Sequence, residues 1–269
     1  ASLLLLFVLV SLFVERAGRG RARYEQQSAR KLKRVRPRFI RRWLLSCYAA
    51  AVFLFAFAIP VARLLFWVVD SGARDFDSRY WGLVWHTLLL GGGAAIVTVV
   101  TAVFLGYVRR TRQHWLSALA VRGATVGYAM PGSVLAVGIM LSFAAIDRWL
   151  NLQFGTGAVL IGGLFALVLA YAVRFLAVAY GPVEAAFERI RPRILEAART
   201  LGATPAETVR RVWLPLLTPG VLSALLLVLI DVMKEMPATL LLRPFGWDTL
   251  AVRIFEMTSE GEWSRAALP

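Results

Sequence analysis

The chain has 269 residues and a net charge of +15, and 59% of its residues are hydrophobic while only 17% are charged. Soluble domains average about 45–50% apolar and about 25% charged residues, so this composition excludes an ordinary soluble globular domain as well as collagen-like, disulfide-rich and disordered chains. Apolar runs of about twenty residues recur, which is the length that crosses a hydrocarbon core of about 30 Å. The sequence therefore predicts an all-α fold, a polytopic transmembrane helical bundle.

The first apolar segment, residues 1–14, is too short for a complete span and lacks the basic start of a signal peptide. We interpret it as the end of a truncated preceding transmembrane helix, followed by a basic cytoplasmic linker over 15–42. The remaining apolar segments predict five membrane helices, at about 43–69, 83–108, 117–146, 157–180 and 218–242. Cys47, in the first of them, is predicted to be a small buried side chain. The third is too long for one straight span, and we expect a break at Pro131-Gly132 inside it.

Lys and Arg are distributed unequally between alternate loops. Twelve, four and six of them lie in 15–42, 109–122 and 181–215, against two, one and three in 70–82, 147–156 and 243–265. Because basic loops remain on the cytoplasmic side of a membrane, the first set is predicted to be cytoplasmic and the second extracytoplasmic. The same asymmetry accounts for the positive net charge without a nucleic-acid partner.

The loop 181–215 has strong local signals. Its first part predicts a short helix over about 192–201, ended by Gly202 in the left-handed conformation that closes many helices. A capping box with proline at the first helical position, Thr204-Pro205-Ala206-Glu207, then predicts a second helix, which is expected to end before Pro215. From composition alone the loop is either a solvated connector or a surface that fits a groove of another protein.

The spacing within this loop resembles the signature loop of ABC importer permeases, which reads EAA, three residues, G, nine residues, I, one residue, LP. The matching residues here are Glu196, Ala197, Ala198, Gly202, Val212, Leu214 and Pro215, with valine in place of isoleucine. The resemblance covers about residues 80–269 and implies the type I ABC importer permease fold in a bacterial inner membrane. It also implies that the helix around 196–202 is a coupling helix, which docks into a separate ATP-hydrolysing subunit. This chain would then hold no ATP, no other cofactor and no catalytic residue.

A second resemblance, over Lys234–Arg253, is to the ferric-iron branch of these permeases. In that branch one polypeptide carries two permease halves, so 43–269 is expected to be one half, with the family's last helix missing after Pro269. The implied partners are ATP-binding cassette ATPase subunits, an extracytoplasmic substrate-binding protein, the second permease half and membrane lipid. Importers of thiamine, phosphonates or polyamines share much of this pattern and remain alternatives.

Ionisable residues at membrane depth are costly and usually face a bundle interior or a watery path. The spacing of Asp231, Lys234 and Glu235 predicts that they share one helix face, and Pro237 predicts a bend beside them. Arg174 needs a carboxylate or carbonyl partner, for which this cluster is a candidate. These five residues are either a translocation path or gate, or a structural set in which Asp231 and Lys234 neutralise each other.

Two other functional classes are alternatives. A membrane-embedded enzyme would need a nucleophile and base, but the sequence contains no HExxH, GxSxG or Walker A motif and no cysteine metal cluster. A scaffold that recruits a cytosolic partner through 181–215 is the other alternative. Finally, 249–257 has the period of an amphipathic helix, with a predicted apolar stripe of Leu250, Ala251, Ile254 and Phe255 at the outer membrane surface.

Overall fold

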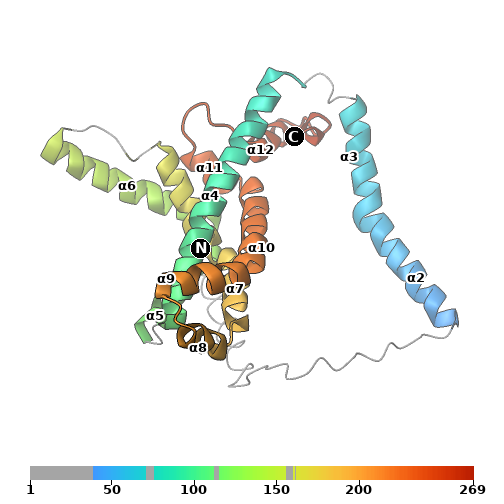
Figure 1. Ribbon diagram of the computed structural model, residues 1–269. Coiled ribbons are helices and arrows are strands. Elements are labelled where there is room, and N and C mark those ends of the chain that lie inside the picture. Colours follow the sequence, from blue (N-terminus) through green and yellow to red (C-terminus); the bar gives the residue numbers. More distant parts are fainter. Residues whose placement is uncertain (1–38, 71–75, 112–114, 156–159, 161) are drawn as a thin grey trace. The chain divides into compact units, whose positions relative to one another are not determined.

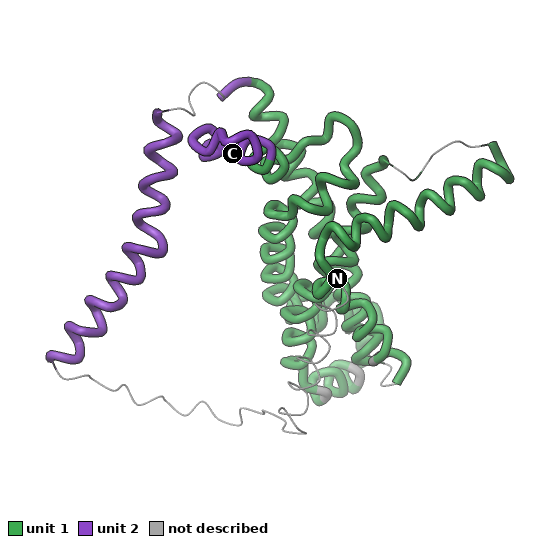
Figure 2. The backbone as a smooth tube through the Cα atoms, turned by 180° about the vertical axis from the view of Figure 1, so that it is seen from behind, with its two compact units in different colours: residues 1, 78–255 green, residues 2–77, 256–269 purple. Residues whose placement is uncertain are grey.

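The computed structural model describes residues 39–70, 76–111, 115–155, 160 and 162–269. These residues form an all-helical fold (Figure 1). They divide into two compact units, one of residues 78–255 and another that joins 256–269 to the residues before 78 (Figure 2). The predicted segment 1–14 and the linker up to residue 38 lie outside the described residues.

The second unit begins with one long apolar helix. It consists of α2 (Phe39–Phe53), the π-helical turn η1 (Leu54–Ala58) and α3 (Ile59–Asp70). Its 32 residues have a mean hydropathy of 2.3 over the most apolar window, and none of that window is buried. The prediction that Cys47 is buried was therefore wrong, since this side chain is exposed. Lipid tails are as apolar as a protein interior, so a helix of this composition is stable in a membrane without a protein neighbour.

The first unit holds four further helices long and apolar enough to cross a membrane. They are α4 (Ser78–Thr111), α6 (Gly132–Phe154), α7 (Leu164–Arg189) and the continuous helical stretch that ends with α10 (Leu214–Met233). Together with the helix of the second unit they match the five predicted spans. The predicted break at Pro131-Gly132 is confirmed, because α5 (Trp115–Thr125) and the 3₁₀ turn η3 (Val126–Ala129) precede it and α6 begins after it.

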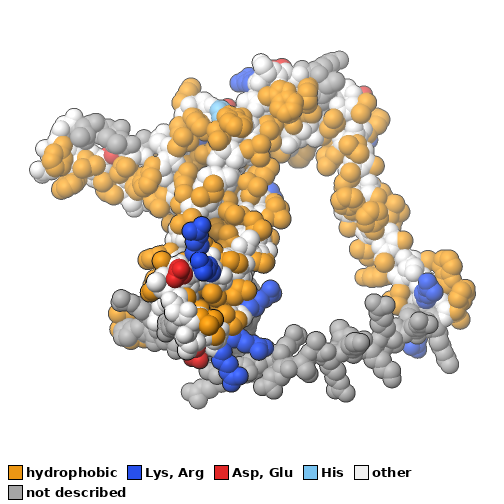
Figure 3. Space-filling view, in the orientation of Figure 1, with side chains coloured by type: hydrophobic (Ala, Val, Ile, Leu, Met, Phe, Trp, Pro, Cys, Tyr) orange, Lys and Arg blue, Asp and Glu red, His pale blue; other side chains and the backbone are white. Residues whose placement is uncertain are grey.

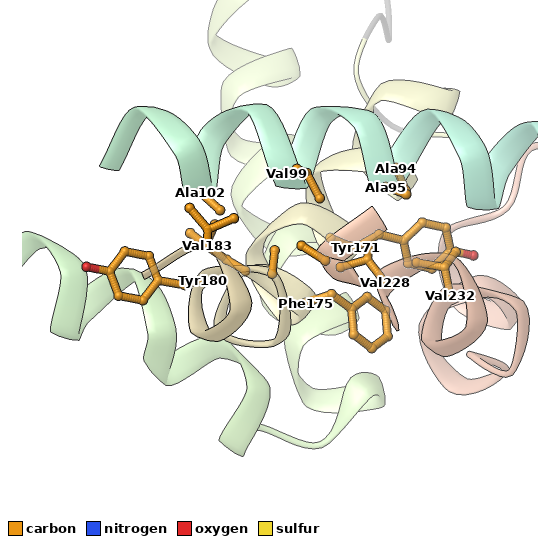
Figure 4. Packing of buried hydrophobic residues seen from close by; sticks show 14 of the residues in the cluster. Ala94, Ala95, Val99, Ala102, Tyr171, Phe175, Tyr180, Val183, Val228 and Val232 are labelled. Atoms are coloured by element: carbon orange, nitrogen blue, oxygen red, sulfur yellow. The ribbon is translucent and has the colours of Figure 1, made fainter. Parts of the chain in front are cut away.

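The core of this unit lies where α4, α7 and α10 pack against one another. Figure 4 shows small and medium side chains of the three helices filling the contact, among them Ala102 of α4, Val183 of α7 and Val228 of α10. Glycine allows the closest approaches: a Cβ at Gly220 would lie 2.7 Å from the carbonyl oxygen of Pro182 in α7. Close backbone packing of this kind stabilises helix pairs in lipid, where no hydrophobic effect drives them together.

Several helices are longer than predicted. α6 continues to Phe154 and α7 to Arg189, so parts of both predicted loops are helical. The second short helix does not end before Pro215, as it was expected to. Instead α9 (Pro205–Thr208), the π-helical turn η4 (Val209–Trp213) and α10 form one helix of 29 residues. The wide turn provides the reason, because the Leu214 N–H bonds back to the Val209 carbonyl and Pro215 then occupies the first turn of α10, where no N–H is required.

The end of α10 also differs from the prediction, which placed a single span over 218–242. α10 ends at Met233, and the short helix α11 (Pro237–Leu242) starts with Pro237 in its first turn. The predicted bend at this proline is thus a complete interruption of the helix.

Candidate functional site

The short helix α8 (Pro192–Thr200) lies between α7 and α9 and carries three of the seven signature residues, Glu196, Ala197 and Ala198. Gly202 follows it with φ +80°, and the Ala203 N–H donates to the Ala198 carbonyl at 3.0 Å. This is the six-to-one hydrogen bond of a helix ended by a left-handed residue. The predicted helix and its glycine terminator are confirmed.

The helix α9 begins with the predicted capping box. The Glu207 N–H donates to the Thr204 hydroxyl oxygen at 3.3 Å, and the Thr204 N–H donates to a Glu207 carboxylate oxygen at 2.9 Å. These bonds to Thr204, with the Arg211 guanidinium at 3.8 Å, hold the pKa of the Glu207 carboxyl below its usual value. Two of the first amide groups of the helix are satisfied locally, so the turn between α8 and α9 has a fixed geometry.

The loop is fastened to the core at both ends. After α7, the Ile190 side chain is buried and its carbonyl accepts a hydrogen bond from the Arg110 guanidinium of α4 at 2.7 Å. Before α10, the Trp213 ring packs edge-on against Tyr107 of α4 and Phe187 of α7, with centroids 5.5 Å and 5.2 Å away. The ends of α4 and α7 that carry the predicted cytoplasmic arginines therefore lie side by side.

Five of the seven signature residues are exposed, and Ala198 and Val212 are partly buried. Glu196, Ala197 and Gly202 are exposed, and the neighbouring Leu201 is 86% exposed. Val212 is partly buried and packs against the core, whereas Leu214 and Pro215 at the start of α10 are exposed. An exposed leucine beside small residues forms an apolar surface of the kind that enters a groove of another protein.

The predicted intramembrane cluster separates into two ion pairs. Arg174, in α7, places its Nε 3.0 Å from a Glu235 carboxylate oxygen, with 18% and 7% of the two side chains exposed. Lys234 lies 2.9 Å from Asp231 in a second pair, and its side chain is 67% exposed. The prediction that Asp231, Lys234 and Glu235 share one helix face was wrong for Glu235. Because α10 ends at Met233, the chain turns there and directs Glu235 inward.

Arg174 has a second partner that the sequence did not indicate. Its Nη1 donates to the carbonyl of Met130 at 2.6 Å, directly before the break at Pro131. The next residue, Gly132, starts α6, and a Cβ there would collide with a carboxylate oxygen of Glu235 and lie 3.3 Å from the guanidinium. Arg174 thus contacts both helix interruptions of this unit, and Gly132 leaves the space that the ion pair needs.

Hydrogen bonds around Glu235 fix the start of α11. The Ala238 N–H donates to a Glu235 carboxylate oxygen at 3.3 Å, and the Thr239 hydroxyl donates to the Glu235 carbonyl. The Thr239 hydroxyl also shares a 2.6 Å hydrogen bond with the buried Tyr171 hydroxyl of α7. Tyr171 lies one helical turn before Arg174, so one face of α7 holds this interruption at two points.

The loop after α11 is a tight turn at the other end of the spans. Arg243 and Asp248 form an ion pair across its base, the ring of Trp247 stacks on His86 of α4 at 4.6 Å, and Phe245 at the tip is fully exposed. The expected helix follows as α12 (Leu250–Ser259). Of its predicted apolar stripe, Ile254 and Phe255 are exposed and Leu250 and Ala251 are partly buried, while Val252 and Met257 are buried.

The surface separates apolar spans from basic ends. In the space-filling view, apolar side chains cover the long helices, and Lys and Arg gather toward the end that carries α8 and α9 (Figure 3). Exposed arginines at this end include Arg189, Arg191, Arg193, Arg210 and Arg211. Within the described residues, no three His, Cys, Asp or Glu side chains are placed to hold a metal ion.

Comparison with known proteins identifies the family. Residues 98–266 match the model of the binding-protein-dependent transport system inner membrane component. The chain belongs to this family. It is therefore a multi-pass membrane permease of a bacterial ABC importer, a component that does not itself catalyse a reaction and works with a separate ATP-binding subunit.

Individual relatives share less than a third of their aligned residues with this chain. The permease is similar to the Fe(3+)-transport system permease protein FbpB 2 of Haemophilus influenzae, with 26% identity over 223 residues. That match covers 81% of this chain but 42% of the relative, so the chain spans less than half of that protein. It is also similar to PhnV of Salmonella typhimurium, a permease assigned to 2-aminoethylphosphonate transport, with 29% identity over 79% of this chain and 82% of the relative.

A solved structure supports the fold. The crystal structure of a bacterial ABC transporter involved in the import of the acidic polysaccharide alginate matches 85% of this permease and 88% of its own chain, with a TM-score of 0.61 and 15% sequence identity. The predicted all-α ABC importer permease fold is thereby confirmed. At this identity the likeness concerns the fold alone.

Proposed function

We propose that this permease lines the transmembrane path of an importer for ferric iron and that α8 is its coupling helix. The observation that carries the coupling role is the exposed surface of Glu196, Ala197, Leu201 and Gly202, on and directly after α8, in a loop whose two ends are attached to the core. ATP binding would bring two ATPase subunits together and pull this surface with them. The path would then alternate between inward and outward access.

Further partners follow from the same family. An extracytoplasmic binding protein would deliver the substrate to the end of the bundle opposite α8. A second permease half would complete the path, and we propose that it precedes residue 43 in the same polypeptide. The cytoplasmic position of 15–42 and 181–215 rests on the asymmetry of Lys and Arg between loops.

The iron assignment rests on the resemblance over Lys234–Arg253 and on the similarity to the Haemophilus ferric permease. The ion pairs of Arg174 with Glu235 and of Lys234 with Asp231 leave the cluster without net charge. A neutral cluster gives no strong electrostatic preference for a cation or an anion, so we assign selectivity mainly to the binding protein.

A phosphonate is the second candidate substrate. The observation that favours it is the match to the 2-aminoethylphosphonate permease, which has the higher identity and covers most of that relative. Thiamine and polyamines remain alternatives from the sequence pattern. A scaffold without transport activity is the alternative of another class.

Growth under ferric limitation tests the assignment. The full-length permease with its ATPase and binding protein should restore growth of an iron-uptake mutant. Glu235→Gln should reduce that growth, because it leaves the partly buried Arg174 without a charged partner. Asp231→Asn should change growth less, since the exposed Lys234 can be solvated by water.

Stimulation of ATP hydrolysis by a phosphonate-loaded binding protein, and none by a ferric one, would replace iron with the second candidate. Absence of any associated ATPase would favour the scaffold.

A further inference from the structure

The two helices that flank α8 meet again at membrane depth. α7 leads directly into the loop at Ile190, and the continuous helix α9–η4–α10 leads out of it. Arg174 lies on the first of these helices, and Glu235 lies two residues after the second ends at Met233. Their ion pair of 3.0 Å therefore joins the middle of α7 to the far end of the continuous helix, while α8 joins the near ends of the same two helices.

α7 is suited to transmit displacement over this distance. From Arg174 to Arg189 it rises about 22 Å at 1.5 Å per residue. Pro182 removes one hydrogen bond within this stretch, but the next turn is held from both sides: Val183 is fully buried, Phe187 packs over Gly106 of α4, and Ala186 faces Gly220 of α10. Close-packed contacts of this kind move as a unit, because protein interiors are dense and not easily compressed.

Beyond Arg174 the contacts lead to the two interrupted helices. One bond from its guanidinium holds the Met130 carbonyl, immediately before α6. The ion pair holds Glu235, whose carboxylate accepts a hydrogen bond from Ala238 in the first turn of α11. Interrupted helices at membrane depth are the elements that open and close paths in many transporters. A single side chain of α7 thus binds the residues that lead into both helices.

We propose that Arg174 is a positioning residue that transmits movement of α8 to the starts of α6 and α11. This inference rests on the proposed coupling role of α8, and it assigns to Arg174 a task other than contact with the substrate. Without the two bonds of Arg174, α8 still docks on the ATPase, but α6 and α11 no longer follow α7. ATP hydrolysis then loses its dependence on the loaded binding protein.

The test uses the full-length permease assembled with its ATPase in proteoliposomes, with the iron-loaded binding protein as the stimulus. The variant Arg174→Gln/Glu235→Gln removes one positive and one negative charge together. Its matched control, Asp231→Asn/Lys234→Gln, removes the same charges from the neighbouring exposed pair. Two quantities are measured: the amount of ATPase that co-purifies, and the ratio of ATP hydrolysis with and without the loaded binding protein.

The control should keep its ATPase, and its stimulation ratio should fall much less than that of the Arg174→Gln/Glu235→Gln variant, because Lys234 is 67% exposed and can be solvated by water. The Arg174→Gln/Glu235→Gln variant should keep its ATPase, and its stimulation ratio should fall at least about fivefold, the lower end of typical coupling between sites. If the double variant assembles poorly, Arg174→Lys takes its place as the test variant. The compact ammonium can pair with Glu235 but has no planar fork to reach Met130 as well, so assembly should be normal and the ratio intermediate.

Either of two results would overturn the proposal. One is a wild-type stimulation ratio in the assembled Arg174 variants. The other is a loss of assembled complex with a normal ratio in what remains, which would make the ion pair purely structural. If the iron-loaded binding protein does not stimulate ATP hydrolysis by the wild-type complex, the proposed substrate is wrong. The Arg174 variants are then compared with the wild type using the binding protein that does stimulate it.

Discussion

Substitution of Gly202 by aspartate separates the coupling role of α8 from its stability. Gly202 has φ +80°, and nothing lies within 4 Å of a Cβ built there. A side chain at this position therefore meets no clash inside the permease, and its only internal cost is the left-handed backbone, about 1–2 kcal/mol for most residues. That cost is small beside the total stability of a folded protein, about 5–15 kcal/mol. The permease should remain folded in the membrane.

The effect on a partner should be much larger. Gly202 belongs to the same exposed surface as Ala197 and Leu201. When a groove of the ATPase covers this surface, a carboxylate at position 202 would be buried without a counter-ion. An uncompensated buried charge costs about 3–5 kcal/mol, which exceeds the strain. We expect Gly202→Asp to lower ATPase association and transport at least about a hundredfold, at 1.4 kcal/mol for each factor of ten. Glu196→Ala should weaken coupling less, because it removes a charge without introducing one.

The assay is co-purification of the ATPase with tagged permease, together with uptake, at equal membrane levels. Gly202→Asn is the matched control, since asparagine has the size of aspartate, carries no charge and tolerates the left-handed region. It should retain more ATPase than the aspartate variant. Gly202→Ala reports the strain alone. Full transport by Gly202→Asp would refute the docking assignment, and equal losses in the alanine and aspartate variants would show that backbone strain, not docking, is responsible.

Three further predictions concern topology, packing and pH. In a cysteine-free background, an impermeant thiol reagent outside intact cells should label a cysteine at Ser78 but not one at Ser28, and the reverse pattern would overturn the orientation. Gly220→Val should destabilise the α7–α10 contact by about 1–3 kcal/mol, as overpacking does, measured as a lower thermal midpoint in detergent; an unchanged midpoint would contradict the close approach. Because the folded state lowers the pKa of the Glu207 carboxyl, ionised Glu207 stabilises α9 above the ordinary glutamate pKa, and this contribution disappears as the pH falls through the lowered value. Amide-exchange protection at the start of α9 should follow that pH dependence and lose it in Glu207→Gln, which has no titrating carboxyl, whereas protection that stays constant with pH would contradict the capping role.

Local signals predicted the parts of the structure that depend on near neighbours. Apolar length located the five spans, Pro131 located the break before α6, and Gly202 and the Thr204 capping box set the ends of α8 and α9. Each of these features is decided within a few residues. This is why a single sequence was sufficient to find them.

The features that the sequence mispredicted or did not indicate have one physical cause in common. Each depends on contacts that the spacing of residues in the sequence does not show. Pro215 normally ends a helix, but the preceding π-helical turn lets α10 continue. Glu235 was placed with Asp231 by helical spacing, yet the helix ends first and the carboxylate turns toward Arg174. The carbonyl of Met130 carries no side-chain signal at all. The one available hint was Gly132 directly after a proline, a position where a close approach could have been suspected.

The ion pair of Arg174 also affects how the protein is made. α7 is apolar enough to enter the membrane, with a mean hydropathy of 1.9 over its most apolar window, although an arginine near the centre of a span opposes insertion by about 2.5–3.5 kcal/mol. Synthesis proceeds at about 5–20 residues per second, so Glu235, about 60 residues later, is not made until about 3–12 s after Arg174. Met130 is already present during this interval. Its carbonyl is therefore the first partner that the nascent chain offers Arg174, and folding of the α5–α6 break would precede the arrival of α10.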